Sequence, residues 1–69
     1  MIALVQIGKG EWSIADLDFE DGDHRWWCGR HEWVSPHSSY WQFMGSEYQT
    51  SFKSRAAAES FAKGKGWIK

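Results

Sequence analysis

The order of apolar and polar positions predicts short β-strands along the first half of the chain. Residues 2–7 form a mostly apolar run that is typical of a buried strand. Glycines on either side of Lys9 predict a turn, after which residues 11–19 indicate a second strand. Within 11–19, apolar residues alternate in one phase up to Ile14 and in the opposite phase from Ala15. Since a one-residue phase slip is what a β-bulge produces, we expect a bulge there.

Residues 25–34 are the most aromatic stretch of the chain, and we expect the central strand of the sheet there. An Asp-Gly pair at positions 21–22 predicts the hairpin turn that leads into it. Side chains alternate along a strand, so one face is expected to carry Trp26, Cys28, Arg30, Glu32 and Val34, and the other Trp27, Gly29, His31 and Trp33. Neither face is polar throughout, so both are expected to contact other groups.

The last third of the chain contains weaker strand patterns and one clear helix pattern. Proline and serines predict a loop over 35–39, followed by a strand over 40–44 and a short edge strand over 48–52. Ser54 is a good N-cap for a helix over 55–63. Its apolar stripe is expected to consist of Ala57, Ala58, Phe61 and Ala62, with Gly64 or Gly66 as the left-handed residue after the helix.

These elements predict a single α+β domain over residues 1–69. Four to five strands form a small antiparallel sheet, and the C-terminal helix packs on one face of it. A chain of 69 residues leaves no room for a second domain. Chains of about this size bury only about 60% of the surface that the unfolded chain exposes, so the core is expected to be thin.

Aromatic residues exceed what so small a core encloses. The chain holds six tryptophans, two tyrosines and four phenylalanines. We expect the excess to lie on the surface, where contiguous apolar area marks an interface. Tryptophan and arginine are the residue types that dominate binding hot spots, so the expected partner-binding anchors are Trp26, Trp27, Arg30, Trp33 and Trp41.

Charge is distributed unevenly along the chain although the net charge is only −1. Residues 1–23 hold one lysine and six acidic residues, whereas residues 24–69 hold seven lysines and arginines and three acidic residues. The two halves either neutralise each other in the fold or steer a charged partner to one side. In the second case, the expected electrostatic rim consists of Asp18, Glu20, Asp21 and Asp23.

Metal and thiol chemistry fit the sequence poorly. In a calcium loop that starts at Asp16, the positions that require glycine and glutamate hold Asp21 and Trp27. A zinc set would have to draw on residues that do not converge on one strand, namely His24, Cys28, His31 and His37. Residues 27–31 echo the Trp-Cys-Gly-x-Cys of thioredoxin-like proteins but lack the second cysteine. We expect no cofactor, no metal and no enzymatic activity, with Cys28 a small buried residue.

Nucleic-acid binding is the alternative to a protein partner. Aromatic rings stack on bases and arginines contact phosphates, which suggests a platform built from Arg25, Trp27 and Arg30. The net charge of −1 argues against it, because electrostatics dominate affinity for nucleic acid.

Two families share short motifs with this chain. The pattern Phe52-x-Ser54-Arg55-x-Ala57-Ala58-Glu59-x-Phe61-Ala62, followed by Gly66-Trp67, resembles the strand-to-helix segment that ends many small phage-encoded α+β proteins. These include inhibitors of host enzymes and of anti-phage defence complexes. The segment Trp27-Cys28-Gly29-Arg30 is similar to the Trp-Gly-Arg signature of the WGR domain, with one residue inserted. That second resemblance implies a DNA contact through Trp27 and Arg30.

The sequence as a whole therefore predicts a small interaction module that sterically blocks a larger protein or protein–nucleic-acid complex, as phage inhibitors do. A second copy of the chain is an alternative occupant of the aromatic surface. A lone cysteine and the lack of an apolar run long enough for a membrane span or signal peptide predict a cytosolic protein.

Overall fold

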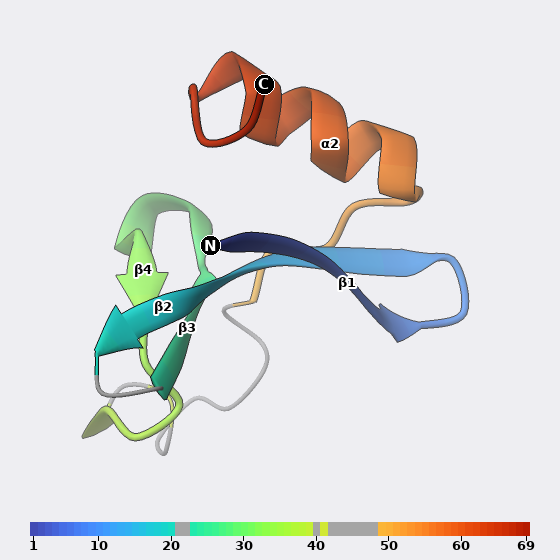
Figure 1. The fold of residues 1–69 in the computed structure, drawn as a ribbon. Coiled ribbons are helices and arrows are strands. Elements are labelled where there is room, and N and C mark those ends of the chain that lie inside the picture. Colours follow the sequence, from blue (N-terminus) through green and yellow to red (C-terminus); the bar gives the residue numbers. More distant parts are fainter. Residues whose placement is uncertain (21–22, 40, 42–48) are drawn as a thin grey trace.

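The computed structural model describes residues 1–20, 23–39, 41 and 49–69. In chain order, its elements are β1 (Ile2–Gly8), β2 (Glu11–Glu20), β3 (Asp23–Trp27), the short 3₁₀ turn η1 (Gly29–His31), β4 (Trp33–Val34) and α2 (Arg55–Gly64). The four strands follow one another in a single antiparallel sheet in the order β1-β2-β3-β4. Helix α2 lies across one face of this sheet (Figure 1). The predicted α+β fold, with one C-terminal helix on one face of a small antiparallel sheet, is confirmed.

The pairing of β1 with β2 determines which side chains face the helix. Leu4 lies opposite Ile14, and Ile2 lies opposite Asp16. Because cross-strand partners share a face, Leu4 and Ile14 point to the side that α2 covers, which we call the helix face. Ile14 is completely buried there against Ala58 and Ala62 of the helix. On the other face, which we call the far face, the β2 residues Ser13 and Ala15 are also buried.

Helix α2 forms where its cap and its alanines predict it. The Ser54 hydroxyl accepts a hydrogen bond of 3.1 Å from the Ala57 N–H, as an N-cap does. Ala58 and Ala62 are fully buried, and their small side chains let the helix lie close to the sheet. Phe61 is half-buried against the same core. The predicted stripe is wrong at Ala57, which is exposed because the helix turns that position away from the sheet.

The end of α2 has the hydrogen bonds of a Schellman motif. Gly66 adopts a φ of 79°, so it is the left-handed residue among the two glycines expected for that role. Its N–H donates to the Lys63 carbonyl, and the Trp67 N–H donates to the Ala62 carbonyl, both at 3.0 Å. The motif turns Trp67 back toward the sheet, where it packs with Phe61.

The predicted central strand over residues 25–34 is wrong. The strand ends at Trp27, and η1 then reverses the chain so that β4 pairs back on β3. Gly29 adopts a φ of 60° and Glu32 a φ of 58°, conformations that a continuous strand does not allow. Hydrogen bonds from Cys28 N–H to Glu32 C=O and from Glu32 N–H to Gly29 C=O close this turn.

Three smaller predictions have mixed outcomes, and a fourth lies outside the described residues. The register of β2 shifts between Asp16 and Glu20 against β3, so its irregularity comes later than the Ile14–Ala15 step that the alternation indicated. The strand predicted over 40–44 is wrong at Trp41, whose backbone is helical, and its other positions lie outside the described residues. The predicted 48–52 strand is reduced, within the described residues 49–52, to one bridge between Phe52 and Trp12. The Asp-Gly turn at 21–22 lies outside the described residues.

Candidate functional site

Rings from the sheet, the helix and the chain beyond it meet at the C-terminal end of α2. The centre of this group is a triangle of indoles, in which ring centroids lie 5.3 Å apart for Trp27 and Trp33, 5.0 Å for Trp27 and Trp67, and 4.8 Å for Trp33 and Trp67. Phe61 lies 6.1 Å from Trp27 and 5.3 Å from Phe52. We call these five residues, Trp27, Trp33, Phe52, Phe61 and Trp67, the aromatic cluster. Tilted and edge-to-face contacts at such distances stabilise the pairs beyond simple burial.

Local geometry explains how the sequence assembles the cluster. Trp27 and Trp33 are direct cross-strand partners in the β3–β4 pair, so they share the helix face. The alternation in the sequence predicted that both rings share one face of a continuous strand. The structure keeps them on one face through a hairpin, because the residues of a cross-strand pair point to the same side.

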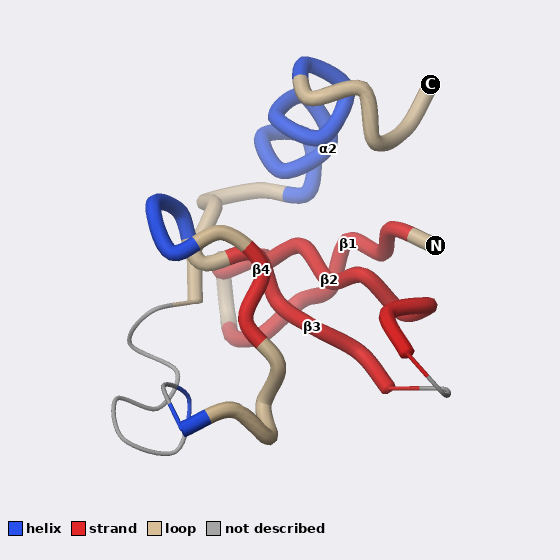
Figure 2. The backbone as a smooth tube through the Cα atoms, turned by 90° about the vertical axis from the view of Figure 1, so that its left-hand side faces the viewer, coloured by secondary structure: helices blue, strands red, loops and turns tan. Residues whose placement is uncertain are grey.

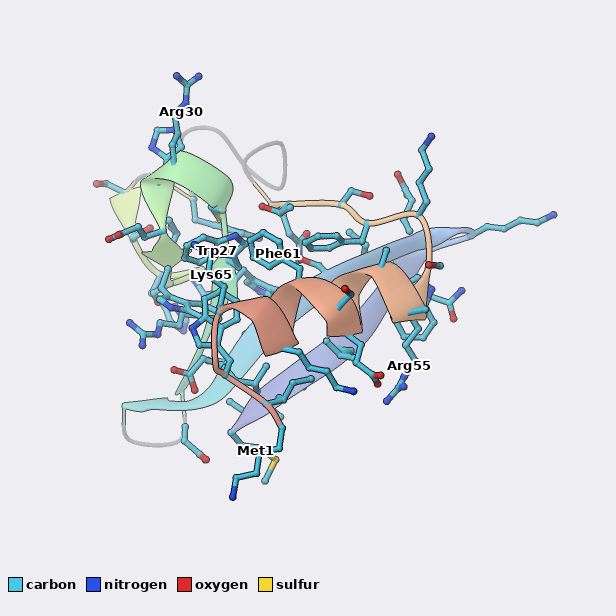
Figure 3. The ribbon with its side chains drawn as sticks, turned by 90° about the horizontal axis from the view of Figure 1, so that it is seen from above. Met1, Trp27, Arg30, Arg55, Phe61 and Lys65 are labelled. Carbon is cyan, nitrogen blue, oxygen red and sulfur yellow. The ribbon has the colours of Figure 1, made fainter. Side chains whose placement is uncertain are left out.

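Two cations lie against the rings. The Arg25 guanidinium is 5.1 Å from the centroid of Trp33, and the Lys65 ammonium is 5.5 Å from Trp27 and 5.6 Å from Phe61. Figure 3 shows Lys65, Trp27 and Phe61 side by side at this end of the helix. Cation–π contacts of this kind are worth about 0.5–1 kcal/mol at exposed sites. The surface of the cluster therefore combines indole rings with positive charge.

None of the six tryptophans is sealed inside the described fold. Each keeps an intermediate exposure, including Trp12, which packs against the core from β2. Trp26 belongs to the far face, where its ring meets His24 edge to face at 5.7 Å. Trp41 is half-buried, and its N–H donates to the Ser38 hydroxyl at 3.2 Å. The predicted anchors thus divide among separate regions, and only Trp27 and Trp33 join one cluster.

The remaining predicted site residues are spread over the surface. Arg30 is exposed on η1 and projects away from the sheet (Figure 3). Asp18 is exposed near the beginning of β1, where its carboxylate lies 2.7 Å from the amino group of Met1. The side chains of the other predicted rim residues, Glu20, Asp21 and Asp23, lie outside the described part.

Asp16 links the N-terminal amino group to the cluster. Its carboxylate accepts a hydrogen bond of 3.1 Å from Arg25 Nε, lies 3.4 Å from the Met1 amino group, and accepts from the Asp18 N–H at 3.2 Å. Partial burial acts to raise the pKa of Asp16, but the Asp18 amide, Arg25 and the amino group together bring that pKa below its usual value. The hydrogen bond that the Met1 amino group donates to the Asp18 carboxylate in turn raises the pKa of that amino group.

The lowered pKa of Asp16 predicts a loss of stability in acid. An ordinary aspartate has a pKa of about 3.9. The stabilisation that Asp16 provides is therefore fully present above that pH, and it is lost as the pH falls through the lower pKa that Asp16 has in the folded protein. Asp16→Asn is expected to reduce the free energy of unfolding at pH 7 by about 1 kcal/mol and to make stability fall less steeply below about pH 4. Urea unfolding of both proteins at several pH values tests this. Parallel acid dependence in the two proteins would contradict it.

The surroundings of Cys28 and of the histidines are described over residues 1–20, 23–39, 41 and 49–69. Cys28 is buried, burial raises the pKa of its thiol, and its Sγ lies 3.5 Å from the Trp26 carbonyl oxygen. A buried thiol with a raised pKa is a poor nucleophile. Over the same residues, no three histidine, cysteine or acidic side chains are placed to share a metal ion. Nor does any helix there have the length and apolar character needed to cross a membrane.

Sequence reasoning missed part of the cluster. It assigned Phe61 to the core stripe and gave no site role to Phe52, Lys65 or Trp67. The available signal was the glycine at position 66, since a Schellman motif pairs the residue after that glycine with the last turn of the helix. That pairing brings Trp67 to Phe61 and thereby to Trp27.

Comparisons with protein-family models, with curated proteins and with solved structures found no match to this chain.

Proposed function

We propose that this chain is a non-enzymatic protein-interaction module that binds a larger protein through the aromatic cluster and the cations beside it. It would act as an inhibitor does, by covering a surface of its partner, and would work in the cytosol. The observation that supports this most directly is that all six indoles keep part of their surface accessible. A protein surface that offers several tryptophans together with arginine and lysine has the composition of a binding hot spot.

Packing within the cluster suits it to binding. Trp27, Trp33 and Trp67 hold one another through mutual ring contacts, so little side-chain freedom remains to be lost when a partner covers them. Arg25 and Lys65 lie over ring faces and give the apolar patch a polar border. An apolar centre with a polar border is the usual anatomy of a protein interface.

The charge arrangement favours a protein partner over a nucleic acid. Arg25 is paired with Asp16, which balances a charge that a phosphate group would otherwise meet. Arg30 is exposed, but the chain as a whole carries a net charge of −1. If the alternative were right, an oligonucleotide at low salt would quench tryptophan fluorescence, and added salt would reverse the quenching. We expect no such quenching.

A charge-reversal pair tests the proposed interface. Lys65→Glu changes an exposed side chain whose ammonium group lies 5.5 Å from the Trp27 ring, whereas Lys9→Glu makes the same change in the β1–β2 turn, at the opposite end of the sheet from the β3–β4 hairpin (Figure 1). Quantitative affinity capture from host cells is expected to recover a partner in stoichiometric amount with wild type and Lys9→Glu, and about tenfold less of it with Lys65→Glu.

Circular dichroism of each variant establishes that it is folded before capture. Equal loss of the partner with both variants would mean that binding depends on overall charge and would contradict the proposed interface. Failure of the folded wild-type chain to retain any protein would contradict the proposed function.

A further inference from the structure

Strand β1 forms one outer edge of the sheet and carries neither a charge nor a proline over its seven residues (Figure 2). Natural sheets usually protect such an edge with charged side chains, proline, bulges or short strands. The opposite edge, β4, follows this rule because it is only two residues long. On β1 the one register shift falls between Gln6 and Gly8, so residues 2–6 present a regular edge.

The alternation of hydrogen bonds shows which backbone groups of β1 point outward. The Leu17 N–H donates to the Met1 carbonyl at 2.8 Å, so these two residues form a hydrogen-bonded pair, and such pairs alternate along an antiparallel ladder. Trp12 agrees with this phase, because its N–H and C=O both bond to Phe52 on the side of β2 away from β1. The backbone groups that point to the outer edge are therefore those of Ile2, Leu4 and Gln6.

Three large apolar side chains are exposed in the described part of the chain, and all lie on or beside β1. Met1 is 72% exposed, Leu17 40% and Ile7 39%. Met1 and Leu17 are cross-strand neighbours, whereas Ile7 lies at the other end of β1. Within one copy these side chains remain two separate patches at the two ends of the same edge.

We propose that two copies of this chain pair edge to edge through β1, antiparallel and about a two-fold axis at Leu4. In this register Leu4 faces Leu4 of the second copy and Ile2 faces Gln6, so all three outward-facing residues gain hydrogen-bond partners. The same register brings the exposed Ile7 of one copy beside the exposed Met1 of the other. The two apolar patches then join into one row that runs from Leu17 through Met1 to the second copy.

Symmetry favours a second copy over an unrelated strand or an open chain of copies. The β1 edge is self-complementary. A single register gives hydrogen-bond partners to its outward-facing N–H and C=O groups and also brings the exposed side chains of Met1 and Ile7 together. A two-fold pairing uses each long edge once and, within the described residues, leaves only the short β4 edges outside, so the assembly closes at two copies. Head-to-tail pairing of β1 with β4 would match seven residues against two.

Gln6→Pro separates this proposal from a folding defect. The side chain of Gln6 is exposed and its N–H points outward, so proline there removes a donor from the dimer ladder and none from the β1–β2 ladder. Gln6→Ala, which keeps the N–H, is the matched control. By sedimentation equilibrium in reducing buffer, we expect wild type and Gln6→Ala to be dimers and Gln6→Pro to dissociate at least about tenfold more readily. The reducing buffer prevents disulfide linkage through Cys28.

Amide hydrogen exchange of the wild-type chain is a second test, which requires no variant. In a β1–β1 dimer the Leu4 and Gln6 amides exchange slowly and become faster on dilution, whereas the Ala3 and Val5 amides are protected in monomer and dimer alike.

A wild-type chain that stays monomeric, including one that pairs β1 only with another protein's strand, would overturn the proposal. So would a folded Gln6→Pro that dimerises like wild type, or a dimer with rapidly exchanging Leu4 and Gln6 amides. If Gln6→Pro unfolds, Ile7→Lys replaces it, and unchanged dimerisation of that variant would be equally decisive.

Discussion

Replacing Trp27 with alanine is expected to lower the free energy of unfolding by about 3–5 kcal/mol. The Trp27 ring contacts Trp33, Phe61 and Trp67, and it also lies under the ammonium group of Lys65. Its removal leaves three rings without their common neighbour and opens a cavity between the β3–β4 hairpin and the helix. Since domains of this size have a total stability of about 3–10 kcal/mol, the loss is a large part of the whole.

Urea unfolding followed by far-ultraviolet circular dichroism measures this effect. Trp27→Phe is the control, because it keeps an aromatic ring in the centre of the cluster and is expected to cost much less. A Trp27→Ala protein within about 1 kcal/mol of wild type would show that the ring contributes little to the fold. In that case its surface would be available to a partner without structural cost.

Sequence reasoning succeeded where the structure depends on neighbouring residues. The cap at Ser54 and the alanines that follow it determine α2 through contacts within a few residues, and the helix forms where they predict it. The β1–β2 hairpin is equally local, because glycines flank its turn, a mostly apolar run precedes the turn and alternating apolar residues follow it. These elements were enough to establish the fold class.

Sequence reasoning failed where contacts between residues far apart in the sequence determine the backbone conformation. Residues 25–34 have strand-forming side chains throughout, and that pattern is the same for one long strand and for two strands that pair with each other. The choice is made by Gly29 and Glu32, which adopt left-handed backbone conformations, and by the pairing of Trp27 with Trp33. A glutamate at positive φ has no signal in the sequence, because it adopts this conformation only when the surrounding turn holds it there.

The candidate site was predicted in part for the same reason. Placing Trp27 and Trp33 together required only alternation along an extended chain. Placing Trp67 and Lys65 beside them required knowing how the helix lies on the sheet, which depends on Ala58 and Ala62 packing against Ile14. Position in the sequence alone could not show that the end of the chain returns to the β3–β4 hairpin.

Leucine at Ala58 is expected to destabilise the fold by about 1–3 kcal/mol or more, whereas leucine at the neighbouring Ala57 is expected to change stability by less than about 0.5 kcal/mol. Ala58 is 0% exposed and packs against Ile14, so a larger side chain must push the helix off the sheet. Ala57 is exposed, and leucine there meets solvent. Both substitutions replace one strong helix former with another, so helix propensity is matched.

Thermal and urea unfolding of the two variants test which side of α2 packs on the sheet. The apolar pattern of the sequence put Ala57 and Ala58 in the same buried stripe, which would make both substitutions costly. The structure predicts that only the substitution at Ala58 is costly. Because the position of Lys65 and Trp67 follows from how α2 is rotated about its axis, comparable destabilisation by the two variants would remove the basis for the aromatic cluster as well as for the core.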